Sequence, residues 1–271
     1  MYHSDSSFSL IQFDGDEVEE RIDEGDCVGR LTDESSITRL TNRGFIASAP
    51  KFHPCPSNKE WKSKYQYLRY NRTWKSDDVI IDSMTNHVTG GWSHKNKNHA
   101  IGGNSSLSSS SLWISTSSDF QWLIWEIVRR LVKLRRDKVE THLIQKCEHI
   151  SRNYKGLKPI HVDPSPHIED KVIEHNHYPF QTVYDVASNF VRASSEILFY
   201  GRIFDKNIIE STVWTKWDTG FQLPDYCYIP RKYWNYRNPW FDRLVWDTND
   251  SSSEAKFKME RRRIQLENSR R

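Results

Sequence analysis

The sequence predicts an α+β fold, because segments typical of strands and of helices follow one another without the regular alternation of a doubly wound sheet. The strongest helix pattern spans residues 120–134, where apolar residues recur at helical period. Compact apolar runs at 112–115 and 196–201 are typical of buried strands. A chain of 271 residues can bury a substantial core, so one main domain is expected.

Composition narrows the function classes. A net charge of +3 is too small to indicate a nucleic-acid partner by itself, and no apolar run reaches the length of about 18 residues that a membrane span needs. The N-terminus has no apolar leader segment, and the four cysteines, Cys27, Cys55, Cys147 and Cys227, form no closely spaced pair. These observations predict free thiols in the cytoplasm or nucleus.

The chain divides into four regions by composition. Residues 1–24 are predicted to be a disordered acidic arm, and residues 25–215 the main domain. Within that domain we expect an irregular insertion at 50–78, rich in Pro, Lys, Tyr and Trp, and a Gly/Ser loop at 87–111. An aromatic C-terminal extension at 216–248 and a charged tail at 249–271 complete the chain.

The first half of the domain contains short apolar units. Residues 26–31 and 44–47 are predicted strands, and residues 79–81 a short buried strand or turn. The strand at 112–115 leads into the main helix, for which Ser118 and Gln121 have the spacing of a capping box. Basic residues at the end of this helix suit its dipole.

The second half alternates between strands and one more helix. Residues 140–150 and 158–162 are possible strands, and residues 183–191 have the apolar stripe of a short amphipathic helix. The apolar runs at 196–201 and 211–214 then predict two further strands.

Three short segments combine into a recognisable order. Arg30 lies in an early strand, a hydroxyl triplet (Ser115, Thr116, Ser117) ends a middle strand, and Glu196 opens a later strand. This order resembles the ADP-ribosyltransferase superfamily, in the Arg-Ser-Glu branch that includes the heat-labile enterotoxin A subunits. The segments also look like an uncharacterised domain found in fungal proteins. The resemblance covers residues 27–214 and implies a split mixed β-sheet core with flanking helices.

The resemblance implies that NAD is the substrate and that its nicotinamide–ribose bond is cleaved. Glu196 would stabilise the oxocarbenium-like transition state, and Ser115 would orient Arg30 and the ribose through its hydroxyl. Arg30 would bind a phosphate of NAD through its forked donors, with Ser115, Thr116 and Ser117 completing the cofactor-binding set.

One residue departs from the family pattern. Many members that modify arginine have Glu or Gln two residues before the catalytic Glu, where this chain has Ser194. A serine hydroxyl cannot act there as a carboxylate base. The expected acceptor is therefore an unknown protein or nucleic-acid group other than arginine, or water in an NAD glycohydrolase.

Structural roles are the alternative for each segment alone. The hydroxyl triplet can simply cap a helix, and Arg30 and Glu196 can be surface charges. A catalytically inactive relative that binds proteins or nucleic acid is the competing function. The segments 61–70 and 231–237 favour it, because they interleave cations with aromatic rings.

Residues 161–177 contain side chains of the kinds that bind metal ions. The candidate ligands are imidazoles and one carboxylate: His161, Asp163, His167, His175 and His177. Their spacing fits no closed tetrahedral pattern, and no cysteine joins them, so no metal is predicted.

Overall fold

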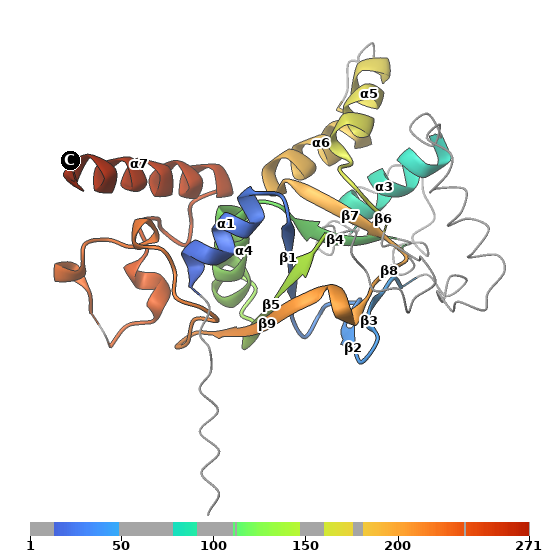
Figure 1. Cartoon of the computed structure of the whole chain (residues 1–271). Helices are drawn as coiled ribbons and strands as arrows, with labels where there is room; N and C mark the ends of the chain where they lie inside the picture. The colour runs from blue at the N-terminus through green and yellow to red at the C-terminus, as the bar shows by residue number, and fades with distance from the viewer. Residues whose placement is uncertain are drawn as a thin grey trace, which may run out of the picture.

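A computed structural model describes residues 14–48, 78–90, 111, 113–146, 160–175, 181–235 and 237–270. The predicted α+β class is confirmed, and the helices surround a six-stranded sheet and a three-stranded sheet (Figure 1). The strands of the larger sheet, in spatial order, are β6 (Ile160–Val162), β7 (Glu196–Tyr200), β4 (Trp113–Ser117), β1 (Cys27–Thr32), β5 (Lys138–Gln145) and β9 (Ile208–Thr215). The smaller sheet contains β2 (Leu40–Thr41), β3 (Gly44–Ile46) and β8 (Arg202–Ile203).

The larger sheet opens in its middle. Strand β1 pairs with β4 at one position only, Gly29 opposite Ser117, whereas β1 pairs with β5 along its whole length and β4 does the same with β7. All described strand pairings in both sheets are antiparallel, whereas the resemblance implied a sheet with mixed strand directions. The opening between β1 and β4 is where the candidate site lies.

Gly29 lies at the single contact between these strands, directly under the helix α4 (Phe120–Val132). A Cβ atom at this position would come within 2.2 Å of Leu123 Cδ1. The buried Leu123 side chain would therefore have to shift to admit any larger residue here.

Helices cover two regions of the larger sheet. The helices α3 (Asp78–Gly90), α5 (Ser165–His175) and α6 (Val183–Ser194) share one apolar cluster with β4, β6 and β7. Helix α4 joins α1 (Gly15–Asp23) and α7 (Ser252–Arg270) in a second cluster over β1 and β5. Short 3₁₀ helices follow at Asp205–Asn207, Asp225–Cys227, Arg231–Tyr233 and Trp240–Arg243. No described helix combines the length and apolar character that crossing a membrane requires.

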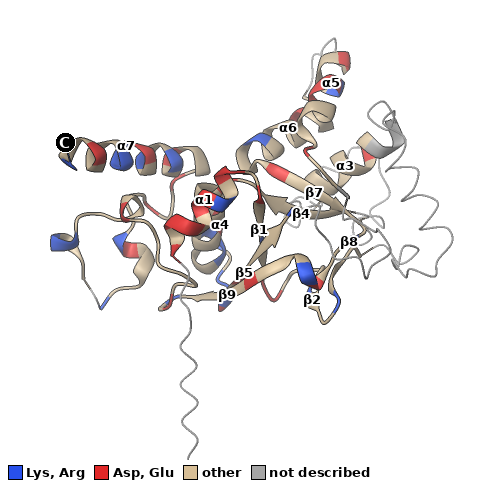
Figure 2. Cartoon of the chain, in the orientation of Figure 1, with Lys and Arg blue, Asp and Glu red and all other residues tan. Residues whose placement is uncertain are grey.

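The N-terminal prediction was wrong over residues 15–23. This acidic stretch is a helix, not a disordered arm, because Val18 and Ile22 lie one turn apart and are buried in the main core. Residues 1–13 lie outside the described part of the chain. Acidic residues are frequent along α1 (red in Figure 2). One of them, Glu19, forms an ion pair with Arg263 of α7.

The C-terminal predictions need a similar correction. Residues 216–248 do not form a separate extension, because Phe221, Trp240 and Trp246 are buried in the same core as Trp214 of β9. Residues 252–270 form the helix α7, which Met259 anchors in that core. The buried aromatic side chains of residues 216–248 thus supply a large part of the apolar core in a chain of polar composition.

Two further boundaries differ from expectation. The predicted strand or turn at 79–81 is part of the helix α3, which also includes residues 87–90 of the predicted Gly/Ser loop. The N-cap of α4 is Asp119 and not Ser118, since the Asp119 carboxylate accepts the Trp122 N–H at 2.7 Å. The remainder of that loop, residues 91–110, and the predicted insertion up to residue 77 lie outside the described residues.

Candidate functional site

Arg30, Ser115 and Glu196 come together at the opening between β1 and β4. Arg30 Nη1 donates a 2.6 Å hydrogen bond to the Ser115 carbonyl oxygen, and its Nη2 donates to the Thr38 carbonyl at 3.1 Å. Glu196 begins β7, beside Ser117 of β4. Arg30 is 8% exposed and Glu196 4%, so neither is the surface charge that the structural alternative assumed.

Glu196 is a buried carboxylate with a strongly shifted pKa. Burial raises the pKa of its carboxyl to about 7, although a hydrogen bond from Ser115 and the charge of Arg30 act in the opposite direction. Its Oε1 atom has no hydrogen-bond partner among the described residues. The group is therefore close to half ionised at neutral pH and has capacity to accept a further hydrogen bond.

Arg30 also has a donor to spare. Its guanidinium packs over the Phe45 ring at 4.7 Å, and within the described part of the chain its buried Nε has no acceptor. Burial lowers its pKa to about 9, with the nearby charge of Arg130 adding to the effect and Glu196 opposing it. The side chain remains a cation at neutral pH, as phosphate binding requires.

His87 is a site residue that the sequence did not reveal. It lies on α3, and its Nε2 is 2.8 Å from the Ser115 hydroxyl oxygen. Burial and then the charge of Arg30 lower its pKa to about 3, so the imidazole is neutral. The Ser115 hydroxyl therefore lies between two polar groups: it is within hydrogen-bonding distance of His87 Nε2, and its hydrogen bond to Glu196 lowers the pKa of that carboxyl.

Ser115 thus differs from its predicted role. Its carbonyl oxygen contacts Arg30, and its hydroxyl faces His87 and Glu196. The sequence signal that could have revealed His87 is a helix over residues 78–90, which Ile81, Met84 and Val88 indicate by their helical spacing.

Thr116 and Ser117 lie close by, but their hydroxyls are used in the protein. Thr116 Oγ1 donates to the Ile197 carbonyl at 2.7 Å, and Ser117 Oγ donates to the Ser194 carbonyl. These bonds tie β4 to β7 and to the turn that precedes Glu196. Their geometry supports a structural role in place of the predicted contact with the cofactor.

The turn before Glu196 receives hydrogen bonds from the segment that follows β4. Ser195 has the left-handed conformation, with φ of 46°, which is uncommon for a residue other than glycine. Both the N–H and the hydroxyl of Ser118 donate to the Ser195 carbonyl at 3.0 Å. Ser194 donates its own hydroxyl back to Phe190 in α6 at 2.8 Å, so it is not directed at Glu196.

The metal candidates do not converge. His161 lies on β6, whereas His167 and His175 lie on α5, and Asp163 accepts a hydrogen bond from the backbone of Ser165. His177 is outside the described residues. Within the described residues, no group of three or more His, Cys, Asp or Glu side chains could hold a metal ion.

The aromatic-basic segment at 231–237 is largely self-contained. Trp234 donates from its indole to the Ile229 carbonyl at 2.8 Å and lies 5.0 Å from the Tyr228 ring. Arg231 and Arg243 already contact its ring. The segment 61–70 lies outside the described residues, so only one of the two predicted stacking surfaces is visible, and its indole is engaged within the protein.

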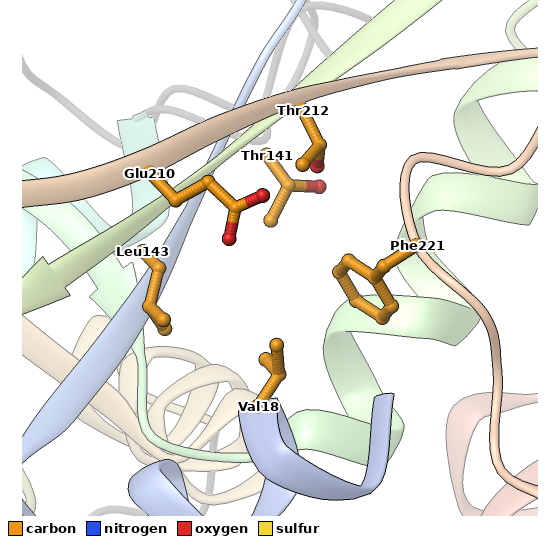
Figure 3. A pocket seen from close by; sticks show the side chains of 6 residues that line it. All are labelled: Val18, Thr141, Leu143, Glu210, Thr212 and Phe221. Carbon is orange, nitrogen blue, oxygen red and sulfur yellow. The ribbon is translucent and has the colours of Figure 1, made fainter. Parts of the chain in front are cut away.

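A separate hollow lies between α1, β5, β9 and Phe221 (Figure 3). Glu210 and the hydroxyls of Thr141 and Thr212 face it, and the two hydroxyls have no hydrogen-bond partner in the described structure. Its volume of about 10 Å³ suits a single water molecule. A nucleotide cannot fit there.

Comparison with known proteins gives no further guidance. No protein-family model matches the chain, and no curated protein does.

Proposed function

We propose that the protein cleaves the nicotinamide–ribose bond of NAD, as an ADP-ribosyltransferase or an NAD glycohydrolase. The observation that carries the proposal is the meeting of Arg30, Ser115 and Glu196, which lie far apart in the sequence, at the opening of the sheet. Surface charges and helix caps have no reason to converge in this way. Arg30 Nε and Glu196 Oε1, which have no hydrogen-bond partner among the described residues, are a donor and an acceptor of the kinds that NAD needs for its phosphate and its ribose hydroxyl.

In the proposed reaction, Arg30 binds a phosphate of NAD, and the Glu196 carboxylate lies beside the nicotinamide-bearing ribose. The carbon–nitrogen bond breaks with its electron pair passing to nicotinamide, and Glu196 stabilises the positive charge that develops on the ribose. An acceptor oxygen then bonds to the ribose carbon and releases its proton. The contact with His87 Nε2 restricts the Ser115 hydroxyl, which in turn orients the carboxylate.

Ser194 supports an acceptor other than arginine. The side chain at this position is 5% exposed and bonded to its own helix, so it cannot bind or deprotonate an incoming guanidinium. Water or a hydroxyl of a protein or nucleic acid needs less assistance. Hydrolysis is therefore the first activity to assay.

The test is a titration of the whole protein with NAD, followed by thermal shift and by nicotinamide release. We expect saturable stabilisation and a release rate that Glu196→Gln lowers by at least about a hundredfold. Glu20→Gln, which removes a carboxylate from the exposed side of α1, is the matched control. Equal release by Glu196→Gln and the control would refute the role of Glu196, and no shift with NAD would refute the function.

A further inference from the structure

The C-terminal helix reaches the turn that presents Glu196. Lys256, in the first turns of α7, donates from Nζ to the Ala193 carbonyl at 2.9 Å and pairs with the Asp119 carboxylate. Ala193 is in the last turn of α6, three residues before Glu196, and Asp119 caps α4. The beginning of α7 lies beside the ends of these elements in Figure 1.

Three consecutive carbonyls before Glu196 each receive a donor from another part of the chain. Lys256 donates to Ala193, Ser117 to Ser194, and Ser118 to Ser195. These are carbonyls at the end of a helix, where no intrahelical N–H is available, and a cation suits the negative end of the helix dipole. Two of the donors come from β4 and the residue after it. The third, Lys256, belongs to a helix that follows Ala193 by about 60 residues along the chain.

We propose that Lys256 is a positioning residue for Glu196, so that the geometry of the site depends on the docking of α7. The inference rests on the proposed function for its effect on NAD cleavage. Helix α7 is held in place independently, because Ala255 and Met259 are fully buried and Arg263 pairs with Glu19 of α1. Ser195 has an unfavourable left-handed backbone, and a turn of this kind persists only when its surroundings fix it. Lys256 is the cation that joins this turn to the C-terminal helix.

The matched pair for the test is Lys256→Met and Lys258→Met in the whole chain. Both variants remove one charge and one ion pair from the same helix, since Lys258 pairs with Asp250 at 2.6 Å and not with a group of the turn. We expect Lys256→Met to lower kcat for nicotinamide release by between about ten- and a hundredfold with KM for NAD little changed, because Arg30 is untouched. Lys258→Met should retain wild-type kcat, and Lys256→Arg should recover most of it.

A second readout does not depend on NAD. The pH dependence of the stability difference between Glu196 and Glu196→Gln chains reports the ionisation midpoint of Glu196. In the Lys256→Met background, a loosened turn lets water reach the carboxylate, and the midpoint should fall from about 7 toward 4.5. A shift without any NAD cleavage would support the positioning role while refuting the proposed function.

The same midpoint and the same kcat in Lys256→Met and Lys258→Met would overturn the inference. If Lys256→Met does not fold, Asp119→Asn replaces it, because asparagine still caps α4 but no longer holds the ammonium by charge. An unchanged Glu196 midpoint in that variant would overturn the inference equally.

Discussion

Replacing Glu196 by glutamine should stabilise the protein at neutral and alkaline pH. The carboxylate is buried, and the pKa of its acid is about 7 in the folded chain against an ordinary value of 4.5. Between these values the folded state binds more protons than the unfolded state, so the free energy of unfolding falls as pH rises. Glutamine has nearly the same shape as the protonated side chain and does not ionise, so it escapes this loss.

The magnitude follows from the two pKa values. Each pH unit within the window weakens the wild-type protein by about 1.4 kcal/mol relative to Glu196→Gln, which amounts to about 3 kcal/mol between pH 4.5 and 7. Below pH 4.5 the two proteins should be equally stable, and above pH 7 their difference should be constant. Other groups that titrate in this window, such as Glu210, are present in both chains and cancel.

Urea unfolding at half-unit pH intervals from 4 to 8, followed by circular dichroism, measures this difference. The exposed Glu20→Gln chain controls for the loss of one negative charge. A difference between Glu196→Gln and wild type that stays constant over the whole pH range would refute the reasoning. It would mean that the carboxylate is solvated or fully paired in the folded protein.

Three other outcomes are expected. Nicotinamide release should rise with pH through about 7, since only ionised Glu196 stabilises the developing cation, and a rate that is flat from pH 5.5 to 8.5 would contradict this. His87→Phe should raise the Glu196 midpoint measured by the unfolding assay, because the Ser115 hydroxyl loses its fixed orientation, whereas His87→Gln retains a donor and should stay near wild type. Met259→Ala should lower the free energy of unfolding by about 2–5 kcal/mol, because this side chain is fully buried. In the same urea unfolding assay, Phe257→Ala on the same helix should have little effect, because that side chain is 68% exposed. Equal losses of stability would exclude α7 from the core.

Local sequence signals predicted the elements around Glu196 well. The apolar stripe predicted at 183–191 lies within α6, and the apolar run predicted at 196–201 forms β7 with nearly the predicted boundaries. Long-range contacts explain the failures. Helix α1 is docked by pairing near Gln222, where the Gly15 N–H donates to the Gln222 carbonyl at 2.7 Å, and nothing in the acidic composition of residues 14–24 reveals that partner.

The sequence order singled out three residues that lie close together in the fold, but it predicted neither their contacts nor the presence of His87 beside them. Arg30, Ser115 and Glu196 were chosen by their order along the chain, and they do meet. Which atom contacts which depends on backbone geometry: Arg30 bonds to the carbonyl of Ser115 because β1 and β4 part there, and the freed hydroxyl faces a histidine from α3. A sequence pattern carries residue types and spacing, so it cannot distinguish a hydroxyl contact from a carbonyl contact.

The distribution of hydrogen bonds around Glu196 argues for a functional carboxylate. Donors from Ser117, Ser118 and Lys256 satisfy the backbone of the preceding turn, while Oε1 of the carboxylate itself has no partner among the described residues. A carboxylate retained for stability would show the reverse, since buried charges normally collect hydrogen bonds and ion pairs. The protein fixes the position of Glu196, and burial outweighs the hydrogen bond from Ser115 and the charge of Arg30, so ionisation of the carboxyl costs about 3 kcal/mol. Such a group is stabilised most when a positive charge develops beside it, which is the condition that cleavage of a nicotinamide–ribose bond supplies.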